Sequence, residues 1–421
     1  MEDNPQLKRT KAPSFFLILI LGLLSAIGPF SIDMYLPAFP SLAADLGTTV
    51  GRVTLSLSSF FIGISAGQFL YGPLLDRFGR KKPLYIGLSI YVLASAACIL
   101  ARSVDVLIAL RLLQAIGTCA GMVASRAMVR DLFAVSESAK VFSLLILVIG
   151  VSPIIAPTLG GIIASSLGWR YIFVVLTGIA VVVLAAVHFG LPESRKPDPG
   201  LSLKPRPILL NFIQVMREPQ FYTYALAGAI ASSGLYAYIA GSPYVFMELF
   251  RVTERQYGWI FAIIALGLIG SSQLNSVLLR TYSSEQLVRV ALIIQSTVAL
   301  VLFFGSLTGK LELYSMISLI FLFLCCQGFI FPNSSALALA PFSRMAGTAS
   351  ALMGGIQMSL GALTTALVGF LAGHTSGPMT GVMMGCALTA LVILLTGRRV
   401  IRYQAREADR KEETAEMVNL S

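Results

Sequence analysis

Two ionisable side chains lie within long apolar stretches of the sequence. Asp33 lies in SIDMYLP, near the end of the first apolar stretch, and Arg111 is flanked by LIAL and LLQAIG. Because an ionisable group at membrane depth is costly unless it is paired or hydrated, such groups usually have a function. We predict that Asp33 carries a coupling proton and that Arg111 tunes its affinity. The alternatives are an Asp33 that reaches interfacial water and an Arg111 that is a structural counter-charge or snorkels to the surface.

A basic loop joins the second and third apolar stretches, in YGPLLDRFGRKKP at 71–83. Its glycines permit a tight turn and close approach of helices, and its aspartate is an acceptor among basic side chains. The residues that we predict to form a gating loop are Gly72, Asp76, Arg77, Gly79, Arg80 and Lys81. The simpler interpretation is an ordinary basic loop.

A second motif, GVSPIIAPTLGG at 150–161, lies within the fifth apolar stretch. Two prolines and several small residues would kink a helix and let it pack closely against a neighbour. The residues of this motif are Gly150, Pro153, Pro157, Gly160 and Gly161. A helix that is merely bent explains these residues equally well.

Scattered polar side chains in the apolar stretches are candidates for a substrate pocket. A mostly apolar pocket with a few orienting hydrogen bonds suits a hydrophobic ligand. The candidates are Tyr35, Gln114, Tyr236, Tyr238, Gln327, Asn333 and Gln357. The alternative is that these side chains join helices to one another.

The composition excludes a water-soluble globular protein. Of 421 residues, 31 are Lys or Arg and 20 are Asp or Glu, so 12% are charged, while 56% are hydrophobic. Soluble domains contain about a quarter charged residues, so an apolar surplus of this size indicates a lipid bilayer. The net charge of +11 is then interpreted as a topology signal and not as a nucleic-acid-binding surface.

The sequence offers little for cofactor or metal chemistry. The cysteines, an odd number without CxxC spacing, lie in apolar stretches and are read as packing residues, and the histidines lie near helix ends in different halves. Gly309-Lys310 is followed by Leu311, so a nucleotide-binding P-loop is missing. We therefore predict no metal, no cofactor and no enzymatic activity. The residues concerned are Cys98, Cys119, Cys325, Cys326, Cys386, His188 and His374.

A window of about 20 apolar residues, the length that spans a bilayer, identifies twelve candidate helices. They cover 15–36, 51–74, 83–101, 104–129, 139–165, 170–191, 221–247, 254–279, 286–308, 313–340, 346–373 and 378–397. Most Lys and Arg residues fall in the two terminal segments and in the even-numbered loops, which predicts that both termini are cytoplasmic.

The spans form two groups of six, separated by a proline-rich segment with mixed charges. We predict an N-terminal bundle over 1–191, an interdomain loop over 192–220, a C-terminal bundle over 221–400 and a charged tail over 401–421. Gln114 and Gly117 have a possible echo in Gln327 and Gly328, as a duplication would produce. Two membrane halves around a central site are the usual plan of a secondary transporter.

These motifs carry a specific resemblance. The loop at 71–83 matches the signature G-x-x-x-D-R-x-G-R-R/K of the major facilitator superfamily, and 150–161 resembles the pattern of drug and proton antiporters, with Ala156 in place of the usual glycine. Together with SIDMYLPAFP, RLLQAIG, SRAMVRDLF and MAGTASAL, they make nearly the whole chain similar to the Bcr/CflA family of drug exporters.

The resemblance implies a twelve-helix proton antiporter that removes bicyclomycin- or chloramphenicol-type antibiotics from bacteria. It matches Asp33 to the acidic residue of the first helix, Arg111 to the RxxQ motif, and Asp131 to an acid at the inner end of the fourth helix, a partner for the basic loop.

We therefore expect an all-α, monomeric, multi-pass protein of the bacterial inner membrane that exchanges protons for hydrophobic or amphipathic drugs by alternating access. Its expected partners are a small-molecule drug, protons and the lipid bilayer, without nucleic acid. The alternatives are a proton-coupled transporter of a metabolite such as a sugar or amino acid, and, from another class, a channel or a membrane-embedded enzyme.

Overall fold

The computed structural model describes residues 15–133, 135–198, 205–342, 345–371, 373 and 375–420, and every regular element in this part of the chain is helical. The elements are α1 (Phe15–Asp33), η1 (Leu36–Ala38), α2 (Phe39–Asp45), α3 (Val50–Phe78), α4 (Lys81–Ile99), α5 (Val104–Leu132), α6 (Val135–Leu167), α7 (Arg170–Gly190), α8 (Pro205–Met216), α9 (Pro219–Pro243), η2 (Tyr244–Leu249), α10 (Glu254–Leu278), α11 (Ser284–Leu307), α12 (Leu313–Leu339), α13 (Ala346–Leu371) and α14 (Gly377–Leu420).

Among the described residues, 11 helical segments are long and apolar enough to cross a membrane. They coincide with eleven of the predicted spans and confirm an all-α, multi-pass membrane fold. α9 lies at the place of the remaining span, 221–247, but its many Gly, Ser and Tyr residues make it less apolar, and it is not among the 11. Twelve crossings and cytoplasmic termini therefore stay predictions.

The first span differs from its predicted bounds because its helix is broken. α1 ends at Asp33, Met34 and Tyr35 form a turn, and η1 and α2 follow. Pro37 has no N–H to donate to the Asp33 carbonyl, so the helical hydrogen-bond ladder stops there. The sequence around SIDMYLP thus places Asp33 at the end of a helix and not within one.

The segment predicted to be an interdomain loop also contains a helix, α8. Proline at its first position suits a helix start, because that residue has no helical acceptor for an N–H. α8 buries Val215 and packs Phe212 and Met216 against an apolar core. The prolines of this segment are therefore compatible with a short helix, and its role as an interdomain loop stays a prediction.

The chain divides into two compact units, which we describe separately. The first contains the described residues before Leu203, with Ile239–Leu266 and Gly361–Met379. The second contains Lys204–Tyr238, Gly267–Leu360 and the described residues from Thr380 onward. The predicted division at residues 191 and 221 stays a prediction.

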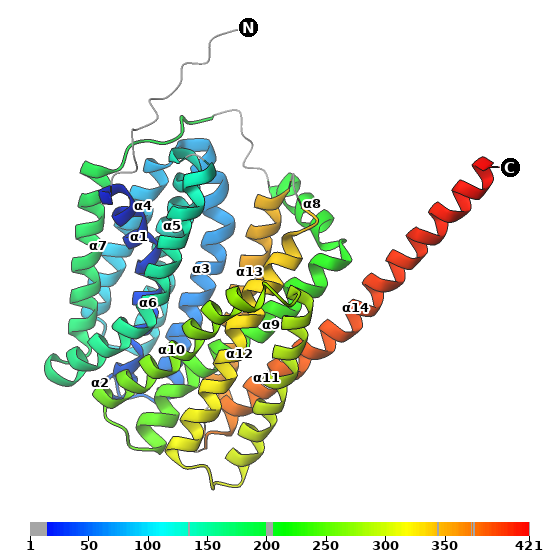
Figure 1. Ribbon diagram of the computed structural model, residues 1–421. Coiled ribbons are helices and arrows are strands. Elements are labelled where there is room, and N and C mark those ends of the chain that lie inside the picture. The colour runs from blue at the N-terminus through cyan, green and yellow to red at the C-terminus, as the bar shows by residue number, and fades with distance from the viewer. Residues whose placement is uncertain are drawn as a thin grey trace. The chain divides into compact units, whose positions relative to one another are not determined.

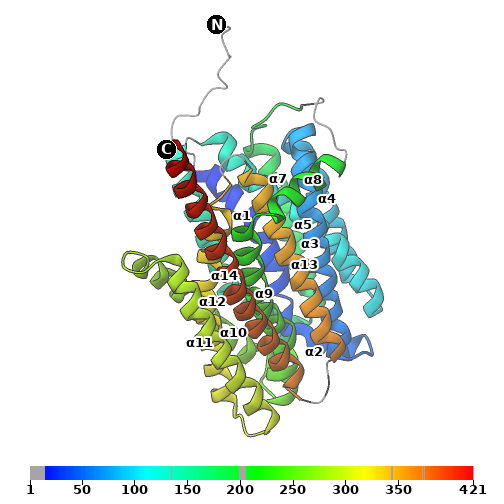
Figure 2. The same ribbon diagram turned by 90° about the vertical axis from the view of Figure 1, so that its right-hand side faces the viewer.

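In the first unit, α5 packs against α1, α3 and α4 (Figure 1). The approach is close because Gly63 of α3 faces the Leu112 carbonyl and Ala115 of α5, where a Cβ atom would collide. Small residues allow this kind of backbone contact between membrane helices. In the second unit, α11 and α12 lie side by side (Figure 2).

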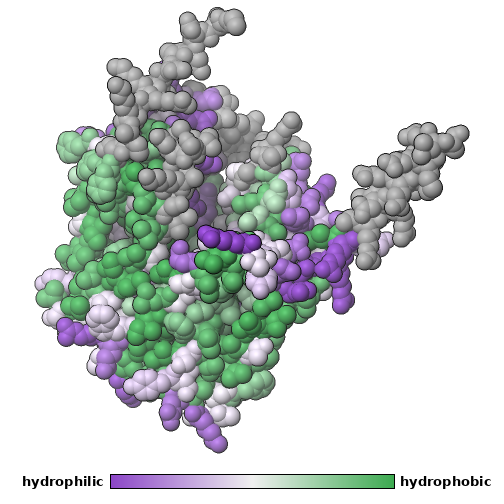
Figure 3. Space-filling model, in the orientation of Figure 1, coloured by the Kyte–Doolittle hydropathy of each residue, from purple (hydrophilic) through white to green (hydrophobic). Residues whose placement is uncertain are grey.

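Apolar side chains cover the flanks of the first unit. On the face shown in Figure 3, hydrophobic residues spread over the region of α6 and α7, while hydrophilic residues gather at helix ends. Val174, Val181, Val182 and Phe189 of α7 are all exposed. An exposed apolar flank of this kind is suited to lipid.

Candidate functional site

Asp33 is the only buried carboxylate among the described residues. Its exposed fraction is 5%, and no hydrogen bond or ion pair joins it to another described residue. The break in α1 leaves it at a helix end, with Tyr257 of α10 nearby in the same unit. A buried carboxyl without a fixed cation is chemically suited to bind and release a proton.

Arg111 of α5 is completely buried and is held by polar groups and aromatic rings. Its Nη1 donates to Gln114 Oε1 (2.6 Å), and its Nη2 donates to the Ser31 carbonyl (2.9 Å). The guanidinium carbon lies 4.2 Å from the ring centre of Phe60 and 4.7 Å from that of Tyr35. Cation–π contacts of this kind stabilise a desolvated cation, so the rings partly replace an acidic partner, which Arg111 lacks within the described ranges.

The two predicted coupling residues are not joined by an ion pair but meet at the same break in α1. Ser31 lies in the last turn of α1, where carbonyls lack helical donors, and Arg111 supplies one. The Ser31 hydroxyl contacts the Tyr91 hydroxyl (2.7 Å). Arg111 therefore reaches Asp33 through the backbone of α1.

The proline- and glycine-containing motif of α6 brings three segments of the first unit together. Gly160 faces the backbone of Met34, next to Asp33, and Gly161 faces the backbone of Glu254 at the start of α10. Gly258 in turn faces the Pro157 carbonyl. These contacts have no room for a Cβ atom, whereas Gly150 faces open space. The motif thus closes α6 onto the break in α1 and onto α10.

The basic loop is organised around Arg80, whose side chain is 5% exposed. Its Nη1 donates to Asp76 Oδ1 (2.8 Å), and its Nε donates to Asp131 Oδ2 (2.7 Å). Burial alone would lower the pKa of Arg80, but the hydrogen bonds and charges of Asp131 and Asp76 outweigh it and raise the pKa above its ordinary value. Arg80 is therefore a fixed cation that the structure brings together with both aspartates.

Sequence reasoning missed three residues of this cluster, which follow α7. Glu193 accepts from the backbone N–H groups of Arg80 (2.7 Å) and Lys81 (3.1 Å). Ser194 donates to Asp131, and Arg195 donates to Asp76. The available signal was the run PESR, in which an acid and a base directly follow an apolar span. Three residues of the predicted loop remain. Gly72 faces open space, Arg77 has its guanidinium over the Phe78 ring, and Gly79 has a positive φ and lies close to Glu193.

Most of the predicted pocket residues are buried and joined to neighbouring groups. Gln327 donates to Ser232 (2.6 Å), and Asn333 donates to Asn275 (2.6 Å). Gln114 binds Arg111 and Ser95, the Tyr35 hydroxyl contacts Ser56, and Tyr236 and Tyr238 are buried. Contacts of this kind link helices and leave few donors for a ligand.

Gln357 differs, because it lines a pocket of about 200 Å³ in the second unit. The buried hydroxyl of Ser334, also in the lining, has no hydrogen-bond partner among the described residues. The remaining walls are largely apolar, with Phe331 and Met353 among them. Gln357 and Ser334 are therefore the polar side chains that a mostly apolar lining places beside this small hollow.

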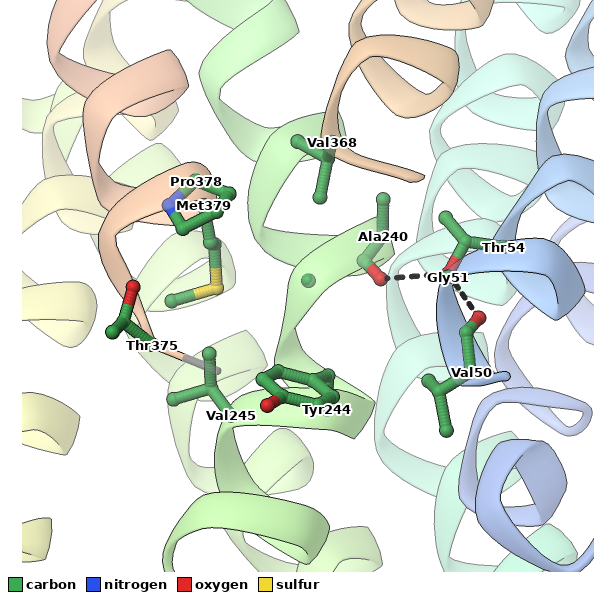
Figure 4. A pocket seen from close by; sticks show the side chains of 11 residues that line it. Val50, Gly51, Thr54, Ala240, Tyr244, Val245, Val368, Thr375, Pro378 and Met379 are labelled. Carbon is green, nitrogen blue, oxygen red and sulfur yellow. Dashed lines mark hydrogen bonds between the residues drawn. The ribbon is translucent and has the colours of Figure 1, made fainter. Parts of the chain in front are cut away.

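A second pocket, of about 300 Å³, lies in the first unit between the start of α3, the η2 region and the start of α14 (Figure 4). None of the predicted pocket residues lines it. The single proton of its Thr54 hydroxyl is within reach of the Val50 carbonyl (3.0 Å) and, at the limit, of the Ala240 carbonyl (3.5 Å), so the wall offers mainly apolar contact.

Comparison with known proteins places this geometry in a family. The model of the Major Facilitator Superfamily matches residues 21–366. The chain belongs to this superfamily. It is therefore a membrane transporter and not an enzyme, and its relatives and apolar helices make it a multi-pass protein of the bacterial inner membrane.

Two curated relatives resemble nearly the whole chain. The chain is 32% identical over 391 residues to a bicyclomycin resistance protein homolog of Haemophilus influenzae, covering 92% of this chain and 98% of the relative. It is 28% identical to a chloramphenicol resistance protein of Pseudomonas aeruginosa, covering 90% and 88%. These relatives confirm the resemblance to the Bcr/CflA family.

Among solved structures, the fold resembles that of a bacterial homolog of the human lysosomal transporter Spinster in an inward-facing, unoccupied conformation. The TM-score is 0.70, the sequence identity is 15%, and the likeness covers 92% of this chain and 96% of the other. At this identity the likeness concerns the fold alone.

Proposed function

We propose that this protein is a secondary active exporter that exchanges protons for hydrophobic or amphipathic drugs. The names of the two relatives, which concern resistance to bicyclomycin and chloramphenicol, support the drug class. The observation that carries the proton coupling is Asp33, a buried carboxylate without a cation partner among the described residues. One charge moving through 100 mV releases about 2.3 kcal/mol, enough to drive substantial drug accumulation per proton.

Alternating access would make Asp33 available to each side of the membrane in turn. In one state the Asp33 carboxyl binds a proton and the drug leaves. In the other state the carboxyl releases that proton and the drug binds. Drug and proton then compete, directly if the drug is cationic and through the local conformation if it is neutral. Competition makes each ligand an effector of the other, and this coupling must be reciprocal.

Arg111 supports this cycle by holding the broken end of α1. Its hydrogen bond to the Ser31 carbonyl lies two residues from Asp33, so a movement of α5 is transmitted to the carboxyl through the backbone. The aromatic rings and Gln114 hold the guanidinium in place. Arg111 thus sets the environment in which Asp33 titrates without neutralising it directly.

The cluster around Arg80 is the proposed gate. Asp76→Asn should slow transport without abolishing drug binding, because it removes one charged partner from a cluster that must open and close in each cycle. The pocket at Gln357 and Ser334 is the proposed place for orienting contacts with the drug.

The test is drug transport driven by a pH gradient in proteoliposomes, with radiolabelled chloramphenicol as the probe. Asp33→Asn should abolish gradient-driven accumulation. The matched control is Asp105→Asn, because Asp105 is an exposed acid that pairs with Arg52. Undiminished accumulation by Asp33→Asn would refute the assignment, and exchange of a sugar or amino acid in place of chloramphenicol would favour the metabolite transporter.

A further inference from the structure

A short segment after α7 lies across the basic loop and contacts it repeatedly. We call residues 193–198 the strap. The first three residues of the strap make the contacts described above. The last residue, Asp198, also contacts the loop, because its backbone N–H donates to the Arg77 carbonyl (3.1 Å). Both ends of the strap are therefore hydrogen-bonded to the loop, although the two segments are more than 100 residues apart in the sequence.

Glu193 of the strap caps the start of α4. Both carboxylate oxygens accept from backbone N–H groups, those of Arg80 and Lys81, which lie where helical donors have no acceptor of their own. The partial positive charge at a helix start also favours a carboxylate. Glu193 thus fixes the position at which α4 begins, and with it the backbone of Arg80.

Ser194 and Arg195 act on the side chains of the same cluster. Ser194 Oγ donates to Asp131 Oδ2 (3.0 Å), the oxygen that also accepts from Arg80 Nε. Arg195 Nη1 donates to Asp76 Oδ1 (3.0 Å), the oxygen that also accepts from Arg80 Nη1. Each aspartate is therefore shared between Arg80 and the strap.

The strap supplies a second cation to the two aspartates of this cluster. Asp76 and Asp131 carry two negative charges around the single buried cation Arg80, and Arg195 supplies the second cation. The charge of Glu193 faces the start of α4. Without Arg195, two carboxylates would share one guanidinium in a partly desolvated place, which is unfavourable.

Gly79 has the conformation that lets the strap approach. Its φ is +83°, in the region that favours glycine, and a Cβ atom would lie 3.1 Å from Glu193 Oε2 and 3.3 Å from the Arg195 carbonyl. Glycine at position 79 thus allows both the positive φ of the turn and the close approach of the strap.

We propose that Glu193, Ser194 and Arg195 are positioning residues of the gate: the strap holds the start of α4 and the Arg80 cluster in their paired geometry, and its release accompanies opening of the cluster. This inference rests on the proposed function only for the role of the gate in transport. Because the strap begins the segment that leads to the second unit, it connects the gate to that segment.

The first test reads the positioning without any substrate, by hydrogen exchange with mass spectrometry on the full-length protein in detergent. Arg195→Ala should speed exchange at the amides of Arg80 and Lys81 by about three- to fivefold, the effect of losing one exposed ion pair on local opening. Arg195 does not contact those amides, so a purely local role would leave them unchanged. Lys196→Ala is the matched control, because Lys196 is the exposed neighbouring cation and should leave exchange unchanged.

The second test is exchange of radiolabelled chloramphenicol between the two sides of proteoliposomes without a pH gradient. Arg195→Ala should lower the maximal exchange rate severalfold while the half-saturating concentration stays the same, and it should add nothing in the Asp76→Asn background. Unchanged amide exchange in Arg195→Ala would overturn the positioning role of the strap. Faster amide exchange with a normal exchange rate would overturn its role in the gate. Wild-type protein that exchanges no chloramphenicol would overturn the proposed drug class. The hydrogen-exchange test alone would then decide whether the strap positions the Arg80 cluster.

Discussion

The two units contain similar polar clusters that differ in charge. In the first, Gln114 of α5 donates to Ser95 of α4 (2.7 Å) and accepts from Arg111, which reaches α1. In the second, Gln327 of α12 donates to Ser232 of α9 (2.6 Å) and accepts from Gln295 of α11 (3.3 Å). Each cluster joins three helices through a central glutamine.

The difference is that only the first cluster contains a cation. Arg111 is surrounded by aromatic rings and lies beside the broken helix that carries Asp33, whereas the second cluster consists of neutral amides and a hydroxyl. Neutral groups can join helices but cannot respond to a proton. The comparison therefore supports placing the proposed proton coupling in the first unit, where the Asp33 carboxyl lies, and we expect the second cluster to have a structural role.

The largest effect should come from removing the cation. Arg111→Ala leaves the Ser31 carbonyl and Gln114 without a donor and opens a cavity, so it should lower the free energy of unfolding by about 4 kcal/mol. Gln327→Ala, its counterpart in the second unit, should cost about 2 kcal/mol. Unfolding by SDS in mixed micelles measures both. Equal losses would contradict the special role of the cation.

A smaller effect should separate the aromatic rings from ordinary packing. Phe60→Leu removes the ring nearest the Arg111 guanidinium, whereas Phe323→Leu removes an equally buried ring from the second unit. The first change should cost about 1 kcal/mol more than the second, which is the contribution of a desolvated cation–π contact. The same unfolding measurement applies, and an equal cost would mean that the rings only fill space around Arg111.

The smallest difference is expected for the two serines. Ser95→Ala and Ser232→Ala each remove one acceptor from a glutamine amide, so each should cost about 1 kcal/mol of unfolding free energy. Only Ser95→Ala should also change gradient-driven chloramphenicol transport, because Gln114 positions Arg111. If Ser232→Ala impairs transport as much as Ser95→Ala does, the second cluster is more than structural.

Sequence patterns predicted the fold well because the bilayer leaves few choices. The apolar stretch at 51–74 became α3, and the motif at 71–83 indicated a tight basic loop that the structure builds around Arg80. Asp131 was tied to that loop by the family resemblance, and the pairing that the structure shows has an electrostatic reason, because Asp131 lies at a helix end beside basic side chains.

The candidate site was harder to predict, because its contacts depend on distant segments. The strap is polar and mostly exposed, and nothing in PESR indicates that its carboxylate caps a helix more than 100 residues earlier. Polar residues such as Gln327 and Asn333 have the same sequence signal whether they face a ligand or a neighbouring helix. Only the tertiary packing separates these cases, and their roles in transport stay predictions.

Proton release from the purified protein tests the central claim most directly. If Asp33 carries the coupling proton, adding chloramphenicol to detergent-purified wild-type protein in weak buffer should release protons, detected with a pH indicator, because drug and proton binding are reciprocally coupled. Asp33→Asn should release none, and Asp105→Asn should release as many as wild type. Proton release by Asp33→Asn equal to that of wild type would contradict the account.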